Sequence, residues 1–185
     1  MTEHVILFAG PMGAGKTTAI RSLSDIEVIS TEATNSDRAT FDKETTTVAL
    51  DYGEIGINET EKIRMYGIPG QRRFDFMWEI LKDRAMGLLL LVHADSPDIG
   101  GSIEEHLEAF GDIVERGGVV VGVTRSDVHG PGALGRAQAA TGRLFPGRPI
   151  PVFEIDARDT EQMRVALMTL IADVEARELI RGSRR

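Results

Sequence analysis

The chain contains no cysteine, and this absence excludes several chemistries at once. Disulfide bonds, zinc sites built from thiolates and thiol catalysis all require the cysteine side chain. Prenylation and palmitoylation require it as well, and Met1-Thr2 does not begin a myristoylation signal. We therefore expect no direct lipid anchor on this protein.

Long hydrophobic runs and excess positive charge are also missing. The longest apolar stretch, "AMGLLLLVHA" (85–94), is too short to cross a bilayer. A strand pattern begins within the first few residues, so we expect no signal peptide. The net charge of -8 argues against broad nucleic-acid binding and against docking on anionic lipid. These features predict a cytoplasmic protein that reaches a membrane only through partners.

The length of 185 residues, with 42% hydrophobic side chains, predicts one domain spanning 1–185. Apolar runs predict strands at 4–10, 47–55, 61–68, 86–94, 119–127 and 150–157. Amphipathic patterns predict helices at 15–25, 73–85, 102–118, 134–145 and 159–180, with Ser102 and Asp159 as N-caps of the third and fifth. This alternation is typical of an α/β fold with a parallel sheet covered on both faces. A turn at 58–60 predicts a hairpin that adds one antiparallel edge strand, and the polar stretch 30–46 predicts a functional loop.

A phosphate-binding motif lies between the first predicted strand and helix. "GPMGAGKTT" (10–18) fits G-x-x-x-x-G-K-[ST], with Lys16 and Thr17 at the last two fixed positions. Small residues let backbone N–H groups surround phosphate oxygens, while the lysine reaches the β- and γ-phosphates and the threonine hydroxyl binds magnesium. The residues expected to bind nucleotide here are Gly10, Gly13, Ala14, Gly15, Lys16, Thr17 and Thr18.

Two further motifs end predicted strands and suggest which base is bound. In "TRSD" (124–127), Asp127 can accept hydrogen bonds from guanine N1 and N2, a pattern that adenine cannot offer. In "DAR" (156–158), the backbone N–H of Ala157 can meet guanine O6. An aspartate that merely caps a turn is the alternative for Asp127. The base-binding residues expected from these motifs are Thr124, Arg125, Asp127, Asp156, Ala157 and Arg158.

In the order of these motifs, the chain resembles the Ras-like small GTPases over nearly its whole length. The run "PGQRRFDFMW" (69–78) is most similar to a bacterial branch that includes MglA and the conservon-operon GTPases. The resemblance implies a P-loop NTPase three-layer fold with a six-stranded, mostly parallel sheet ordered 2-3-1-4-5-6. It also implies a GTP-binding switch that hydrolyses GTP slowly to GDP with Mg²⁺. Members of this branch often work with roadblock-type regulatory proteins, which makes such a protein the expected partner.

The resemblance assigns roles to three more residues. Thr47 matches the switch threonine that binds magnesium, although the neighbouring Thr46 stays an alternative. Gly70 matches the glycine whose N–H contacts the γ-phosphate, and Gln71 matches the residue that orients the attacking water. Lys16 and Gln71 are therefore the expected catalytic residues.

The chain also departs from the family pattern. Gly67 occupies the place of the aspartate that usually holds magnesium through water, and our hypothesis is that Asp51 on the neighbouring strand takes over this role. Thr124 stands where most members have asparagine, and Asp-Ala-Arg replaces Ser-Ala-Lys.

No arginine immediately precedes Thr47, where an arginine finger within the chain would be sought. Arg72 and Arg73 lie next to Gln71, and although arginines at a helix start more often contact solvent or a partner, a catalytic role for them stays an alternative.

Two other functions remain open from the sequence. "GPMGAGKTT" alone also resembles the loop of a small-molecule kinase that uses ATP, although "TRSD" and Gly70-Gln71 have no role in such an enzyme. The second is a nucleotide-binding scaffold that has lost hydrolysis. The missing aspartate at Gly67 favours the scaffold, whereas Thr17, Thr47 and Gln71 favour a working hydrolase.

Overall fold

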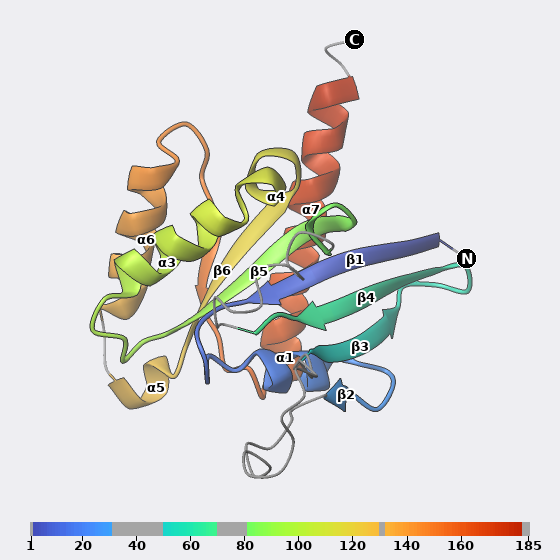
Figure 1. Cartoon of the computed structure of the whole chain (residues 1–185), viewed down its shortest axis with the longest axis horizontal. Helices are drawn as coiled ribbons and strands as arrows, with labels where there is room; N and C mark the ends of the chain where they lie inside the picture. Colours follow the sequence, from blue (N-terminus) through green and yellow to red (C-terminus); the bar gives the residue numbers. More distant parts are fainter. Residues whose placement is uncertain (1, 31–49, 70–80, 130–131, 183–185) are drawn as a thin grey trace, which may run out of the picture.

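The computed structural model describes residues 2–30, 50–69, 81–129 and 132–182 (Figure 1). Within these ranges the chain forms one sheet of seven strands. The strands are β1 (Thr2–Ala9), β2 (Ile29–Ser30), β3 (Asp51–Gly56), β4 (Glu61–Gly67), β5 (Ala85–His93), β6 (Gly118–Thr124) and β7 (Val152–Glu154). The predicted strands are therefore present, apart from residues 47–49, which lie outside the described ranges.

The described helices are α1 (Lys16–Leu23), α3 (Ile99–Ala109), α4 (Gly111–Arg116), α5 (Ser126–His129), α6 (Ala133–Leu144) and α7 (Thr160–Gly182). Most of the helix predicted at 73–85 lies outside the described residues, although Leu81 and Lys82 are helical. Residues 31–46 of the predicted functional loop lie outside them too. None of the helices in the described ranges combines the length and the apolar character that a membrane span requires.

The strand order is β2-β3-β4-β1-β5-β6-β7, and all neighbours from β4 to β7 run parallel. The six predicted strands lie in the predicted order, but the count of six is wrong because β2 adds a seventh. β2 pairs antiparallel with β3, through Ile29 opposite Tyr52 and Ser30 opposite Asp51, so the antiparallel strand β3 is not the edge. A strand of two residues is too short to produce a hydrophobic period, which explains why the sequence does not reveal it.

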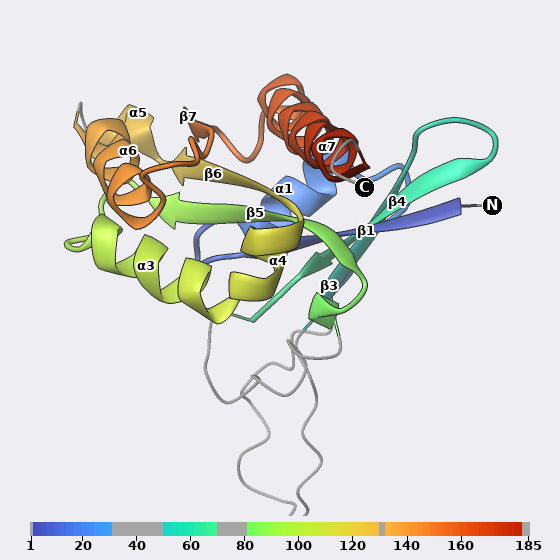
Figure 2. The same cartoon turned by 90° about the horizontal axis from the view of Figure 1, so that it is seen from above.

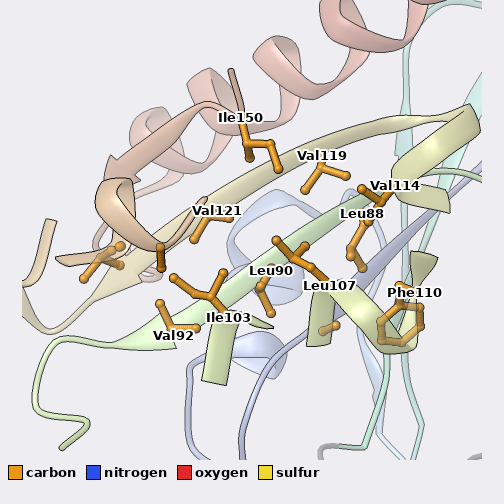
Figure 3. Packing of buried hydrophobic residues seen from close by; sticks show 14 of the residues in the cluster. Leu88, Leu90, Val92, Ile103, Leu107, Phe110, Val114, Val119, Val121 and Ile150 are labelled. Carbon is orange, nitrogen blue, oxygen red and sulfur yellow. The ribbon is translucent and has the colours of Figure 1, made fainter. Parts of the chain in front are cut away.

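Helices cover both faces of the sheet (Figure 2). Residues of β1 alternate between the two: Ile6 and Phe8 pack with α1 and α7, while Leu7 and Ala9 pack with α3, α4 and α6. The central strands β5 and β6 are buried almost throughout, since they carry apolar residues on both sides. Figure 3 shows the second of these cores, in which Leu90 of β5 lies close to Leu107 of α3.

The helix predicted at 102–118 is two helices. α3 ends at Ala109, and Phe110 leaves the helical conformation with φ -106° and ψ 25° before α4 begins at Gly111. The Phe110 side chain is completely buried, so the break turns a large apolar group into the core. Because glycine is a poor helix former, ending the helix next to Gly111 costs little free energy.

The predicted N-cap of this segment is also wrong, because α3 starts at Ile99 and its cap is Asp98. The Asp98 carboxylate accepts a hydrogen bond of 2.8 Å from the Gly101 N–H, whereas Ser102 lies inside the helix. The cap predicted for α7 is confirmed. Asp159 accepts hydrogen bonds from the N–H groups of Glu161 and Gln162.

Two glycine variants test the packing of α7 on the sheet. A Cβ added at Gly118 would lie 2.7 Å from Val174 Cγ2 and 2.8 Å from the Leu170 carbonyl oxygen, whereas nothing lies within 4 Å of one added at Gly142. Gly118→Ala should therefore lower the free energy of unfolding by about 1–3 kcal/mol. Gly142→Ala, in the exposed part of α6, should raise it by about 0.5–1 kcal/mol. Urea denaturation measures both, and equal effects would contradict this packing.

Candidate functional site

The glycine-rich loop, residues 10–15, connects the end of β1 to the start of α1. Its glycines Gly10, Gly13 and Gly15 have φ angles of 138°, 76° and 99°, which other residues rarely adopt. A Cβ at Gly10 would lie 2.0 Å from the carbonyl oxygen of Leu91. The loop can therefore follow this path, close to β5, only with glycine at that position.

Lys16 is the first residue of α1, and its side chain folds back over the loop. Its Nζ donates hydrogen bonds of 2.8 Å to the Gly10 carbonyl and 2.9 Å to the Pro11 carbonyl. The side chain is 9% exposed. Burial lowers the pKa of Lys16 to about 8, and the nearby Asp51 charge opposes this effect. The loop thus holds a desolvated cation, which an anion would stabilise.

Asp51 is the first residue of β3, and its carboxylate joins three segments. It accepts a 2.5 Å hydrogen bond from the Thr17 hydroxyl of α1 and a 2.6 Å hydrogen bond from the Ser30 hydroxyl of β2. Asp51 is only 8% exposed. Ser30 was missed by the sequence analysis, because its contact depends on the pairing of β2 with β3.

Gly67 faces Asp51 across the β3–β4 pair. A Cβ added at Gly67 would lie 3.0 Å from the Asp51 Oδ2 atom and 3.0 Å from Ile20 Cδ1, closer than side chains normally pack. The Asp51 carboxylate therefore occupies the space that a side chain at position 67 would enter. This arrangement is the one that the sequence hypothesis required for Asp51.

The oxygen atoms beside Thr17 are compatible with magnesium, which prefers carboxylate, hydroxyl, water and phosphate oxygens. Thr17, Ser30 and Asp51 supply two hydroxyls and one carboxylate. Among the described residues there is no group of three or more histidine, cysteine or acidic side chains placed to hold a metal. A magnesium ion here would accordingly depend on phosphate oxygens and water for much of its coordination.

A pocket of about 460 Å³ borders the glycine-rich loop. Three separate segments line it: the glycine-rich loop with α1, the end of β6 with α5, and the turn after β7. The lining residues are Gly13, Ala14, Gly15, Thr18, Thr124, Arg125, Asp127, Val128, Asp156, Ala157 and Arg158. All of these except Val128 are predicted nucleotide-binding residues, so the fold brings ten of the fifteen predicted residues together around one pocket.

Thr124 and Arg125 connect the end of β6 to the glycine-rich loop. The buried Thr124 hydroxyl lies 3.1 Å from the Ala14 carbonyl and 3.2 Å from the Val92 carbonyl. The Arg125 guanidinium donates a 3.4 Å hydrogen bond to the Gly13 carbonyl. Arg125 has a φ of 61°, and it is the only described residue other than glycine with a positive value. The fold thus holds one wall of the pocket directly against the loop.

The turn 156–158 also lines the pocket. The Asp156 carboxylate accepts hydrogen bonds from both the backbone and the guanidinium of Arg158. The side-chain bond from Arg158 is the main cause that lowers the pKa of Asp156 to about 2. A Cβ at Gly15 would lie 3.1 Å from the Ala157 methyl group, so the turn packs closely on the loop.

Two histidines that no sequence motif indicates lie next to the glycine-rich loop. The His93 Nε2 atom of β5 lies 3.0 Å from the Met12 carbonyl. His106 of α3 is buried, and its Nδ1 atom lies 2.7 Å from the Ser102 carbonyl. Burial lowers the pKa of His106, while hydrogen bonds to the Ser102 and Gly10 carbonyls oppose this shift. No motif spacing connects either histidine to the loop.

Thr47, Gly70 and Gln71 lie outside the described residues. Their predicted contacts with magnesium, the γ-phosphate and the attacking water therefore stay predictions.

Comparison with known proteins does not assign the chain to a family. No protein-family model matches it, and no curated protein matches it significantly.

The buried ammonium of Lys16 predicts a pH-dependent stability. Below pH 8 the lysine is protonated in both the folded and unfolded states, and its burial cost is fully present. Above this pH the folded state loses the proton first, so the free energy of unfolding should rise until the unfolded pKa of 10.5. Between pH 7 and 9.5 the wild type should gain about 2 kcal/mol relative to Lys16→Met. Urea denaturation at both pH values measures this, and parallel profiles would contradict it.

Proposed function

We propose that this protein is a guanine-nucleotide-binding switch of the P-loop NTPase three-layer fold class, which hydrolyses GTP slowly to GDP with Mg²⁺. The observation that carries the proposal is the pocket beside the glycine-rich loop. Ten of its eleven lining residues are ones that the sequence motifs assign to nucleotide binding. These residues come from three distant parts of the chain, which makes a chance assembly a poor explanation.

Guanine fits the chemistry of this pocket better than adenine does. The Asp127 carboxylate lines it and offers acceptors for two neighbouring donors, which guanine has at N1 and N2. Ala157 also lines the pocket, and its backbone N–H suits the O6 acceptor of guanine. Adenine presents an acceptor at N1 and a donor at N6, so it would reverse both pairings.

The phosphates would lie along the glycine-rich loop, beyond the base pocket. The Lys16 ammonium is held there by the Gly10 and Pro11 carbonyls, and a phosphate would offer it a stronger, charged partner. The loop amides and the N-terminus of α1 would stabilise negative charge on the phosphates. Gln71 would orient a water molecule for in-line attack on the γ-phosphate. Lys16 and the amides would then stabilise the charge that develops during transfer.

Magnesium, when bound, would neutralise phosphate oxygens beside Thr17. We propose that Thr17 and Thr47 supply its hydroxyl ligands and that Asp51 acts through Thr17 or through water. The 2.5 Å hydrogen bond between Thr17 and Asp51 supports this role. So does the close packing of Asp51 against Gly67, where the usual aspartate is missing.

Slow intrinsic hydrolysis follows from the absence of an arginine directly before Thr47. An arginine finger is worth about 10³–10⁵ in rate, so a partner that supplies one would accelerate turnover. We propose a roadblock-type protein as the regulator and a cytoplasmic location, with membrane association through partners. A nucleotide-binding scaffold without hydrolysis is the second candidate, and the glycine at position 67 is the observation that favours it.

The base specificity can be reversed by one change. Asp127→Asn should weaken GDP binding and strengthen binding of xanthosine diphosphate, because the amide can donate to the xanthine oxygen at C2. Calorimetric titration of GDP, xanthosine diphosphate and ADP into both proteins measures this. Asp112→Asn, on α4 and away from the pocket, is a matched control that should change none of the affinities. A wild-type protein that binds ADP as tightly as GDP would refute the guanine assignment and favour the small-molecule kinase.

The magnesium role of Asp51 can be tested by titration. Asp51→Asn should raise the magnesium concentration needed for half-maximal GTP binding without altering the preference for guanine. Glu54→Gln changes a carboxylate on the same strand that bonds Lys62 instead, so it should leave the magnesium requirement unchanged.

A swapped variant tests the same role from the opposite strand. Asp51→Gly combined with Gly67→Asp moves the carboxylate to the usual position. This double variant should need less magnesium for half-maximal GTP binding than Asp51→Gly does. Asp51→Gly alone should keep the raised magnesium requirement. If Asp51→Asn and the wild type titrate identically, the carboxylate has no part in magnesium binding.

A further inference from the structure

Two carboxylates line the same small pocket, which is an unfavourable arrangement unless a cation balances them. Asp127 comes from α5 and Asp156 from the turn after β7. Asp156 is ionised at neutral pH, and its side-chain hydrogen bond with Arg158 lowers its pKa further, to about 2. A base that enters the pocket would displace water and strengthen the repulsion between the two charges.

Arg158 lies between these carboxylates. Its Nη2 atom is 2.7 Å from the Asp156 Oδ2 atom and 3.9 Å from the Asp127 Oδ2 atom. The Asp156 Oδ2 and Asp127 Oδ2 atoms therefore lie no farther apart than the sum of these two distances. One guanidinium nitrogen thus lies within 4 Å of both acids.

The two contacts of Arg158 differ in kind. Its Nε and Nη2 atoms donate hydrogen bonds of 2.8 and 2.7 Å to the two oxygens of Asp156. The 3.9 Å contact with Asp127 is too long for a hydrogen bond. Arg158 therefore attracts Asp127 without occupying the lone pairs that a guanine base would need.

Asp156 also stabilises the turn after β7, which explains the presence of an acidic residue at this position. Its Oδ1 atom accepts a 2.9 Å hydrogen bond from the Arg158 N–H and so closes the turn around Ala157. Its backbone N–H donates to the Gln162 side chain of α7. The turn that presents the Ala157 N–H thus depends on a carboxylate that, without a cation, would repel Asp127.

We propose that Arg158 is the counter-ion that allows Asp127 and Asp156 to share one pocket, so that the Asp156 charge does not repel Asp127 from the position that guanine binding needs. This inference rests on the guanine site proposed above. Arg158 acts on affinity through the two carboxylates, and contact of its own with the base is not required.

The test is a double-mutant cycle read as GDP affinity at saturating magnesium. Arg158→Ala should weaken GDP binding about fivefold, the size expected of a largely exposed charge interaction. Asp156→Asn keeps the oxygen that closes the turn but removes the charge. The double variant Asp156→Asn/Arg158→Ala should therefore bind GDP nearly as well as the wild type. Arg164→Ala removes an exposed arginine paired with Glu161 on α7 and is the matched control, with no expected change.

The salt dependence of GDP affinity provides a second readout, because an effect caused by lost packing would not depend on salt concentration in this way. The Debye length falls from about 8 Å at 0.15 M salt to about 3 Å at 1 M. The ratio of the Arg158→Ala affinity to the wild-type affinity should therefore approach one at high salt. Circular dichroism and thermal unfolding of each variant confirm that the comparison is made between folded proteins, and Arg158→Lys, which keeps the charge, should retain most of the affinity.

Each other outcome identifies what has failed. Tighter GDP binding by Arg158→Ala would mean that the arginine competes with guanine for Asp127, and the inference would be overturned. Equal weakness of Arg158→Ala and the double variant would overturn it too, because the arginine would then act without Asp156. If the wild type binds ADP as well as GDP, the guanine site itself is wrong. If the wild type prefers GDP over ADP and Arg158→Ala binds GDP as tightly as the wild type, the counter-ion role is wrong but the guanine site still holds.

Discussion

The Asp51 carboxylate lies in the space in front of Gly67, and the candidate phosphate site is built around that contact. It ties the first residue of β3 to Thr17 at the start of α1 and to Ser30 on β2. The buried charge faces the Lys16 ammonium, whose pKa it helps to keep from falling further. Because a side chain at position 67 would press on this carboxylate, glycine there and aspartate on β3 form one structural unit.

The other half of the site follows from the sheet order. β1 lies beside β5, which lies beside β6 and then β7, so the parallel strands end at the same edge. Ligands of open α/β sheets bind at this carboxyl edge. The glycine-rich loop, α5 and the turn 156–158 extend from these ends and enclose the pocket. The same pocket brings Asp127 and Asp156 together, and the position of Arg158 is best understood as a response to that crowding.

Much of this arrangement is predictable from sequence because it depends on local patterns. Continuous apolar runs identify β1, β5 and β6, and glycine spacing with Lys16 and Thr17 identifies the glycine-rich loop between β1 and α1. Features that depend on tertiary pairing are not predictable in this way. β2 is too short to show a period, the break at Phe110 follows from burial of its ring, and Ser30, His93 and His106 reach the site only through neighbouring strands or helices. The approach of Asp51 to Gly67 is an exception, because the predicted hairpin pairs their two strands, whereas the magnesium role of Asp51 stays a prediction.

Guanine recognition is the central claim, and a competition measurement tests it most directly. The protein, freed of bound nucleotide, is incubated with equal concentrations of GDP and ADP in magnesium and separated from unbound ligand. Mass spectrometry of the nucleotide released on denaturation then identifies what was bound. The structure and motifs together predict GDP in large excess. ADP in equal or greater amount, or the release of neither nucleotide, would contradict the proposed function.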